Sequence, residues 1–339
     1  MKKYIVLGAL VLIGIGAALH FSIRPSSDII DQSAEKQEKV SAVSVKSTDM
    51  EQSIPLLELE SAMKTPEEES PVIRVIDPEA GYQERLAAMR MLGREMSTND
   101  VAVLMGFLKD PMPEDAKLRP LSYNSIRNDA YEILLRQEEL PEGMGELLIE
   151  GYNRPDQDDM WRNYCLQFMP SYYERVATAK GSGARSVLAT NEDTPSGDSS
   201  SQTPELAVIQ ETLWDALGER DNSNAGTALL ALDKLSRNHE EFKREEINAA
   251  MLDLASDESA SLANRVTAIR LCGEHKNIQA LEAARDLARN ADATMLRCAA
   301  IATLGEIGTE EDMVFLETLT ASRDQRISSI AATSLKKRN

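Results

Sequence analysis

Hydrophobic residues recur with helical spacing between residues 265 and 319, and the same arrangement occurs twice in this stretch. Residues 265–273 and 297–305 share the order Arg, apolar, any, Ala, apolar, any, any, apolar, Gly, at an offset of 32 residues. The apolar positions recur every three residues, so they lie on one face of an α-helix. A third copy covers residues 85–93. The pattern predicts helical hairpins that repeat along the chain.

The first and last positions of the copies invite specific interpretations. The arginines are Arg85, Arg265 and Arg297, and the glycines are Gly93, Gly273 and Gly305. Because glycine takes the left-handed C-cap conformation without penalty, each glycine is predicted to end the first helix of its hairpin. Good N-cap residues for the second helix follow at Ser97, Asn277 and Thr309. The arginines suggest either an anion-binding ladder or a structural contact along the helix interface, and we favour the structural contact.

These Arg-x-x-Ala…Leu-Gly runs, with Cys272 in place of Leu in the middle copy, resemble the HEAT repeats. The short HEAT-like repeats of phycobilin lyases are more similar still, because full repeats usually span about 40–47 residues. The resemblance is clear at the three copies and weaker over most of residues 80–339. It implies an all-α fold, an α-solenoid of stacked helical hairpins. It implies little about activity, because this architecture hosts many functions.

Composition divides the chain into five parts. They are residues 1–24, an export signal or anchor; 25–79, a disordered tether; 80–178, an N-terminal repeat module; 179–204, a low-complexity linker; and 205–339, a C-terminal repeat module. The tether is rich in Ser, Glu, Lys, Asp and Pro, which cannot bury enough apolar surface to offset the entropy of ordering. Two apolar patches interrupt it, at 54–57 and 72–76. Either could dock on a partner or on the first repeat, and the first repeat is favoured for 72–76.

The N-terminus carries Lys2 and Lys3 before a nearly continuous apolar run over residues 4–23. A run of about 20 apolar residues suffices to span a bilayer. The run predicts a signal anchor in the inner membrane of a bacterial cell, with a single pass and the C-terminal part outside the cytoplasm. The small residues Gly16, Ala17 and Ala18 leave a cleaved signal peptide open, which would release a periplasmic or secreted protein.

Charge and motifs argue against several classes of function. The formal net charge is −19, with much of the acid before residue 80, so nucleic acid is not an expected partner. No nucleophile motif, phosphate loop, dinucleotide fingerprint or metal-ligand spacing occurs, so we expect no catalytic residues, no cofactor and no metal. His275 follows Gly273 in a turn and is expected to be an ordinary exposed residue.

Aromatic residues are concentrated in the first module. Six of the eight tyrosines lie between residues 123 and 173. Four aromatic residues do not obviously occupy core positions of the repeat: Tyr152, Trp161, Tyr172 and Tyr173. They are candidate partner-binding residues, since exposed aromatic side chains favour recognition. The alternative, that they fill an irregular part of the solenoid, is favoured slightly.

The leading functional hypothesis is a non-catalytic solenoid scaffold or adaptor that binds a protein or peptide partner in the cell envelope. Stacked hairpins bury one face against their neighbours and leave an extended surface for a partner. The alternative follows from the resemblance, which implies a chromophore- or ligand-handling protein related to the HEAT-like lyases.

Overall fold

The computed structural model describes residues 70–114, 116–187 and 203–338. Within these ranges all regular secondary structure is helical, as predicted. The predicted membrane segment, nearly all of the tether and the apolar patch at 54–57 lie outside the described residues. Among the residues described, none of the helices combines the length and the apolar character needed to cross a membrane.

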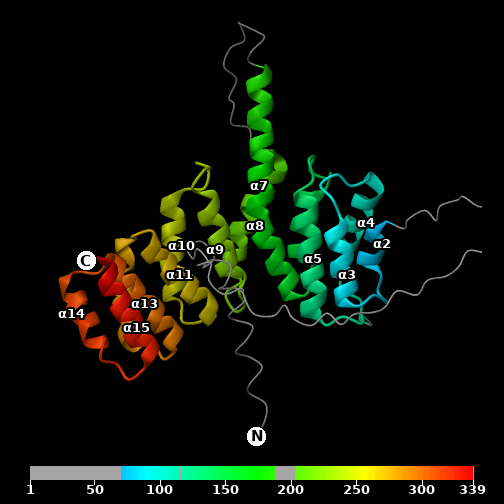
Figure 1. The fold of residues 1–339 in the computed structure, drawn as a ribbon. Coiled ribbons are helices and arrows are strands. Elements are labelled where there is room, and N and C mark those ends of the chain that lie inside the picture. Colours follow the sequence, from blue (N-terminus) through cyan, green and yellow to red (C-terminus); the bar gives the residue numbers. More distant parts are fainter. Residues whose placement is uncertain (1–69, 115, 188–202, 339) are drawn as a thin grey trace, which may run out of the picture. The chain divides into compact units, whose positions relative to one another are not determined.

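The helices follow one another as hairpins, with short turns between the two helices of most pairs (Figure 1). Their bounds are α2 (Pro71–Ile76), α3 (Tyr82–Met91), α4 (Thr98–Lys109), α5 (Pro120–Leu135), α6 (Met144–Asn153), α7 (Asp159–Val187), α8 (Pro204–Asp215), α9 (Asn224–Leu235), α10 (Arg244–Ser256), α11 (Leu262–Glu274), α12 (Leu281–Asn290), α13 (Thr294–Ile307), α14 (Glu310–Leu319) and α15 (Gln325–Arg338), with short 3₁₀ helices η1 (Ala216–Gly218) and η2 (Ile278–Ala280).

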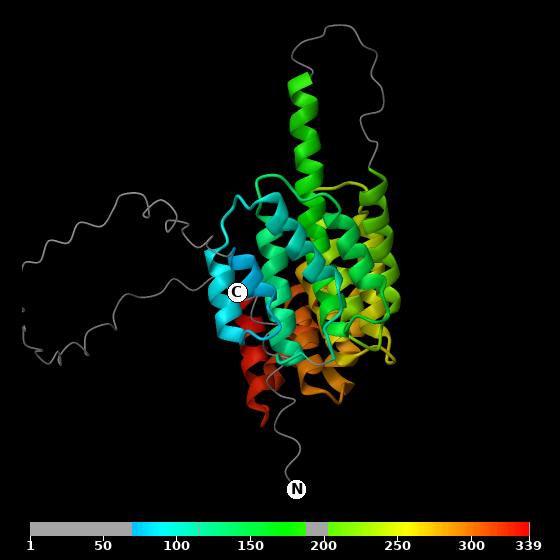
Figure 2. The same cartoon turned by 90° about the vertical axis from the view of Figure 1, so that its right-hand side faces the viewer.

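The hairpins stack in two layers (Figure 2). In the first layer α3, α5, α7, α9, α11, α13 and α15 contact one another in that order. In the second layer α2, α4, α6 and α8 do the same, and α10 contacts α12. The described residues belong to one compact unit, and one hydrophobic core runs through it from Val72 to Ala331. The two predicted repeat modules therefore share a core, with α7 packed on α9 and α6 on α8.

Several local predictions can be compared with these helices. Thr309 and Asp312 form the predicted capping box at the start of α14, and Ser97 caps α4 by accepting from the Asp100 backbone N–H at 3.1 Å. The apolar patch at 72–76 forms α2, which packs on α3 and α4. Helix α7 continues to Val187, into the stretch that composition predicts to be a linker.

The glycine prediction is wrong in its mechanism. Gly273 and Gly305 lie inside α11 and α13 and do not take the left-handed conformation. A Cβ on Gly273 would lie 3.0 Å from the Thr303 Cα, and one on Gly305 would lie 2.6 Å from the Ser334 Cβ. These glycines therefore allow the next helix of the first layer to approach closely. The left-handed residue after α11 is Lys276, with φ of 51°.

Gly93 neither takes the left-handed conformation nor allows another helix to approach closely. It follows the end of α3 at Met91, and a Cβ on it would approach nothing closer than the Glu95 backbone N at 3.8 Å. The shared glycine of the three sequence copies thus has different surroundings in the first copy than in the other two.

Replacing Gly305 with Ala should lower the stability of the protein. The added Cβ collides with α15, and overpacking of this kind costs about 1–3 kcal/mol, against a gain of about 1 kcal/mol in helix propensity. The matched control is Gly106→Ala in α4, where a Cβ meets open space and only the gain in propensity applies. Urea denaturation of both variants should shift the midpoint down for the first and up for the second. Equal shifts in one direction would contradict the close-approach role.

Candidate functional site

The repeated arginines connect each hairpin to the helix before it. Each guanidinium Nε donates to a backbone carbonyl in the last turn of the preceding helix, where carbonyls have no partner within the helix. The pairs are Arg85 with Val75, Arg265 with Ala255 at 3.2 Å, and Arg297 with Ala288 at 3.4 Å. A cation at this end is also favourable to the helix dipole. The arginines thus make the structural contact that was favoured over an anion-binding ladder, and their partner is a backbone carbonyl.

Two further arginines in the weaker copies of the repeat do the same. The Nη2 of Arg127 donates to the Leu108 carbonyl at 2.6 Å, and its guanidinium lies 3.8 Å from the centre of the Trp161 ring. Arg162 donates through Nε to the Tyr152 carbonyl at 2.7 Å. Arg127 is fully buried, and this burial lowers its pKa to about 10. Its charge is therefore retained near neutral pH and is balanced by carbonyl and ring contacts.

The four candidate aromatic residues are buried, which corrects their assignment as partner-binding residues. Tyr152, Trp161, Tyr172 and Tyr173 are at most 5% exposed. The reason is that they lie on α6 and α7, and α7 contacts α5, α6, α8 and α9, so it is covered on more than one side. Wide side chains fill the space between these helices. The alternative interpretation of this cluster, as irregular core, is the one that the structure shows.

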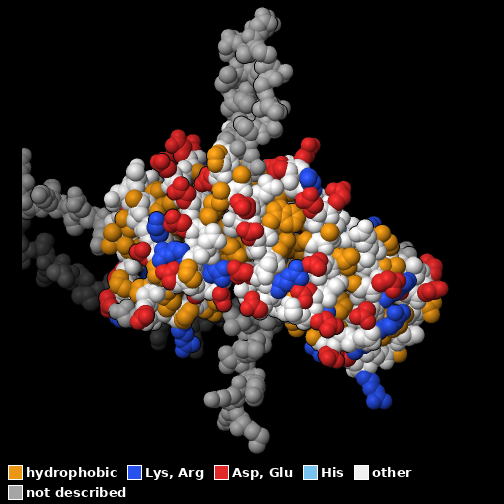
Figure 3. Space-filling view, turned by 180° about the vertical axis from the view of Figure 1, so that it is seen from behind, with side chains coloured by type: hydrophobic (Ala, Val, Ile, Leu, Met, Phe, Trp, Pro, Cys, Tyr) orange, Lys and Arg blue, Asp and Glu red, His pale blue; other side chains and the backbone are white. Residues whose placement is uncertain are grey.

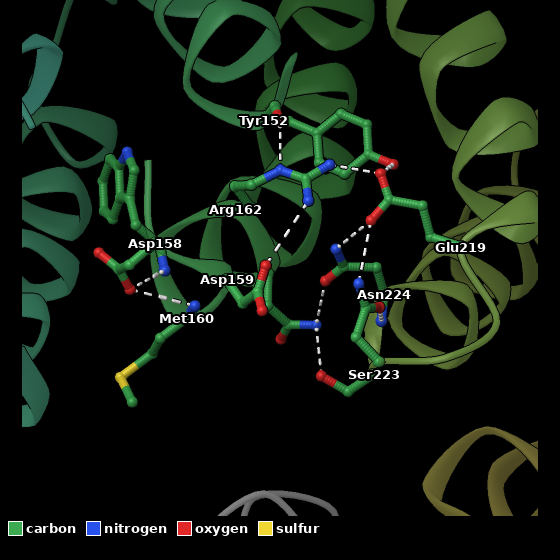
Figure 4. A network of polar contacts seen from close by, with 11 residues as sticks. Tyr152, Asp158, Asp159, Met160, Arg162, Glu219, Ser223 and Asn224 are labelled. Atoms are coloured by element: carbon green, nitrogen blue, oxygen red, sulfur yellow. Dashed lines mark hydrogen bonds and ion pairs between the residues drawn. The ribbon is translucent and has the colours of Figure 1, made fainter. Parts of the chain in front are cut away.

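The hydroxyl of Tyr152 belongs to a polar network at the junction of α6, α7 and α9 (Figure 4). It donates to Glu219 Oε1 at 2.8 Å, and Arg162 binds the same oxygen. The other oxygen, Oε2, accepts from Asn224 at 2.8 Å and from Asn222 at 3.1 Å. Burial would raise the pKa of Glu219, but these hydrogen bonds outweigh it and lower the pKa to about 2. The network therefore fixes a carboxylate between the two parts of the repeat array.

A second buried carboxylate joins α9, α10 and α11. The Asp233 side chain is 3% exposed, and its Oδ1 lies 2.6 Å from Arg244 Nη1 and 2.7 Å from His275 Nε2. Its Oδ2 lies 2.8 Å from Arg237 Nη2. Arg244 Nη1 also lies 3.2 Å from His275 Nδ1. One ring nitrogen of His275 therefore faces a carboxylate and the other a guanidinium.

The environment of His275 corrects the prediction that it is an ordinary exposed residue, since its side chain is only 18% exposed. Sequence reasoning missed this cluster because its members are far apart in the chain, with Asp233 on α9, Arg244 on α10 and His275 directly after α11. Only the stacking of α9 on α11 brings them together. Among the described residues, no group of three or more His, Cys, Asp or Glu side chains is arranged to hold a metal ion.

The surface offers a different kind of site between α4 and α6 in the second layer. A hollow of about 220 Å³ is lined by Met105, Gly106, Lys109, Gly143, Glu146, Leu147 and Glu150. Gly143 begins α6 with a left-handed φ of 77°, which other residues rarely adopt. A Cβ on Gly106 would meet no atom within 4 Å. Because glycine has no side chain, nothing projects into the hollow from α4 at Gly106 or from the start of α6 at Gly143.

Charge around the α4–α6 hollow is unevenly paired. Lys109 Nζ lies 3.2 Å from Glu150 Oε2, whereas Glu146 forms no ion pair within the described ranges. The base of the hollow is supplied by the half-buried Met105 and the buried Leu147. The hollow therefore combines an apolar base with an acidic rim.

Figure 3 shows the face of the molecule opposite to that of Figure 1, where hydrophobic side chains lie among acidic and basic ones.

One family model matches part of the chain. Residues 248–336 match a model described as HEAT repeats, and this range runs from α10 to α15 in the stacked helical array. No curated protein sequence matches the chain.

Some solved structures are similar to the chain at low sequence identity. The X-ray structure of Escherichia coli YibA is 15% identical with a TM-score of 0.41, covering 79% of this chain and 92% of that one. A designed armadillo repeat protein is 14% identical with a TM-score of 0.37, covering 80% and 100%. The complex of CpcE and CpcF of phycocyanin lyase from Nostoc is 14% identical with a TM-score of 0.30, covering 87% and 100%.

Replacing Arg127 with Ala should destabilise the protein by about 2–4 kcal/mol, because it leaves buried carbonyl groups without their donor and removes the group stacked on Trp161. Arg270 is the control, since its side chain is 42% exposed and pairs only with Glu274. Arg270→Ala should change the free energy of unfolding by less than about 0.5 kcal/mol. Chemical denaturation followed by circular dichroism measures both. A loss in Arg127→Ala as small as in the control would refute the structural role.

The Glu219 network should weaken in acid. Because the pKa of Glu219 is lowered to about 2 in the folded protein, its stabilising contribution is complete above the unfolded pKa of about 4.3 and is lost as pH falls toward 2. Glu219→Gln removes this titration. Between pH 6 and pH 3 the variant should lose about 1–2 kcal/mol less stability than the wild type, after discounting for partial exposure. If the free energy of unfolding of the two proteins fell by the same amount between pH 6 and pH 3, the carboxylate would not be held in this way.

Proposed function

We propose that this protein is a non-catalytic adaptor that binds a segment of a protein partner in the hollow between α4 and α6. One observation carries the proposal, namely a hollow in which the half-buried Met105 lies beside the exposed Glu146, whose carboxylate forms no ion pair in the described ranges. The segment that fits this chemistry carries a basic residue next to a large apolar one. The net charge of −19 adds long-range attraction for such a partner.

The other polar features of the array lie between its helices and are not available to a partner. This supports the choice of the α4–α6 hollow as the binding site. The arginines between hairpins, the Glu219 network and the Asp233 cluster each make their polar contacts with neighbouring parts of the array. The aromatic residues that the sequence offered as a recognition surface are in the core. The α4–α6 hollow differs because its lining includes Gly106 and Gly143, which have no side chains and so leave surface that a partner can contact.

The adaptor is proposed to act in the cell envelope. The apolar run at residues 4–23 would hold it in the inner membrane, and residues after Arg24 would lie outside the cytoplasm. The acidic, Pro- and Ser-containing stretch that follows would then act as a spacer between the membrane and the repeats. Alkaline carbonate extraction of native membranes tests this, because an anchored chain stays in the membrane pellet and a cleaved one is released with a new N-terminus.

Gly106→Leu should abolish binding in the α4–α6 hollow without loss of stability. The new side chain enters open space and improves helix propensity, while it occupies the apolar base. The probe is a fluorescein-labelled peptide with the sequence Leu-Lys-Leu-Lys, titrated with the full chain and followed by anisotropy. We expect saturable binding to the wild type and weakening of roughly tenfold or more in the variant, which corresponds to about 1.4 kcal/mol.

Gly218→Leu is the matched control, because a Cβ at this position also meets open space and lies outside the hollow. It should bind the peptide as the wild type does. Absence of saturable binding to the wild type, or equal binding by both leucine variants, would refute the assignment of this hollow.

A further inference from the structure

A larger hollow lies in the other layer of the array, between α3 and α5. Its volume is about 530 Å³, within the range of roughly 300–1,000 Å³ typical of ligand sites. The apolar part of its lining comes from Leu86, Met89, Leu92 and Ile133, and the polar part from Arg90, Arg94, Arg136 and Asp129, with Gly93 between them. Three guanidinium groups in one hollow are unexpected in a chain with so large an excess of acid.

Two of these guanidinium groups form no direct polar contact in the described part of the chain. Arg90, in the last turn of α3, and Arg94, in the turn that follows, are exposed and form no hydrogen bond or ion pair within the described ranges. Arg136 donates through Nε to the Glu132 carbonyl at 3.1 Å, and its Nη2 lies 3.7 Å from the Glu132 carboxylate. The lining thus holds three guanidinium groups and one carboxylate, that of Asp129. Its net charge is positive, opposite to that of the α4–α6 hollow.

The rim of the hollow is held in place by a buried side chain. Gln137 is 6% exposed, and its Nε2 donates to the Gly93 carbonyl at 3.3 Å while its Oε1 accepts from the Met96 backbone N–H at 3.0 Å. Arg175 from α7 donates to the Gln137 carbonyl at 2.9 Å. The turn after α3 and the end of α5 are therefore fixed relative to each other, and the hollow is formed before any ligand binds, which lowers the entropic cost of binding.

Asp129 decides which kind of anion fits. Its carboxylate is half-buried in the lining, and burial raises its pKa, although Asn128, Arg136 and Arg90 act in the opposite direction. A ligand in this hollow should therefore bring hydrogen-bond donors as well as a negative charge. A peptide has both, since its backbone N–H groups can donate to Asp129 while an acidic side chain meets the arginines. A fatty acid has the charge and the apolar body but no donor.

We infer that the hollow between α3 and α5 is a second binding site, specific for a peptide segment that carries an acidic residue beside a large apolar one. The apolar side chain lies on the half-buried Leu86 and Leu92, and the carboxylate meets Arg90 and Arg94. The site goes beyond the proposed function, because it lies in the opposite layer and selects the opposite charge. Together the two hollows would let one protein hold two partners of different chemistry.

The test uses a fluorescein-labelled Leu-Glu-Leu-Glu peptide and the full chain, followed by anisotropy. The wild type should bind this peptide saturably. Arg94→Glu should weaken binding by roughly tenfold or more, because it removes an attractive charge and adds a repulsive one. Arg323→Glu is the control, since Arg323 is exposed and lies outside the hollow, and it should bind as the wild type does. Both variants alter exposed residues, so circular dichroism should show both folded.

Two further measurements distinguish peptide binding at this site from binding in the α4–α6 hollow and from binding of a fatty acid. Gly106→Leu should leave binding of the acidic peptide unchanged, so failure of one hollow is distinguishable from failure of the other. Decanoate in excess should not displace the peptide, because it offers Asp129 no donor. No saturable binding to the wild type, equal weakening by Arg94→Glu and Arg323→Glu, or displacement by decanoate would each overturn the assignment.

Discussion

The array depends on a single recurring contact, the donation of a side-chain N–H from an arginine to the last turn of the preceding helix. A helix ends with carbonyl groups that its own backbone cannot satisfy, and in a stacked array those ends lie near the next hairpin. An arginine in the first helix of that hairpin meets the need with a charge of the favourable sign. At Arg265 and Arg297 the same geometry recurs in successive repeats. Each hairpin is thus completed by its successor.

Where the contact is missing or modified, other polar groups replace it. Helix α9 has no arginine at the repeat position, and the Glu219 network with Arg162 and Asn224 lies at this junction instead. One repeat further on, the Asp233 cluster links α9 to α10 and α11. Buried charges of this kind are tolerated because each has close partners. They allow the core to remain continuous across a stretch where the repeat pattern is weak.

The repeating features of the fold could be predicted from the sequence, whereas the roles of individual residues in contacts between helices could not. The period, the helical hairpins and several caps follow from patterns within about ten residues, such as Thr309 with Asp312. The role of Gly273 and Gly305 could not be found this way, because it depends on the approach of Thr303 and Ser334 from the next helix. The burial of Trp161 was equally hidden, since it depends on Arg127 and on how many helices surround α7.

The two surface hollows lay beyond sequence reasoning for the same reason. Each forms between helices that are neighbours within a layer and not consecutive in the chain, and each is lined by residues that look ordinary one at a time. They are distinguished by charged side chains that lack a hydrogen-bonding or ion-pairing partner in the described part of the chain. In the described part of the chain, Glu146 in one hollow and Arg90 and Arg94 in the other form no ion pair or hydrogen bond through their side chains, and half-buried apolar side chains lie beside them. Such positions suit the binding role proposed for this protein.

Hydrogen exchange in an Arg265→Gln variant tests the coupling between hairpins most directly. If the arginine completes the preceding hairpin, amide exchange should accelerate in the last turn of α10 as well as in α11, while α3 to α6 keep the protection of the wild type. Unchanged exchange at the end of α10 would contradict the account, because the Ala255 carbonyl would then not depend on Arg265.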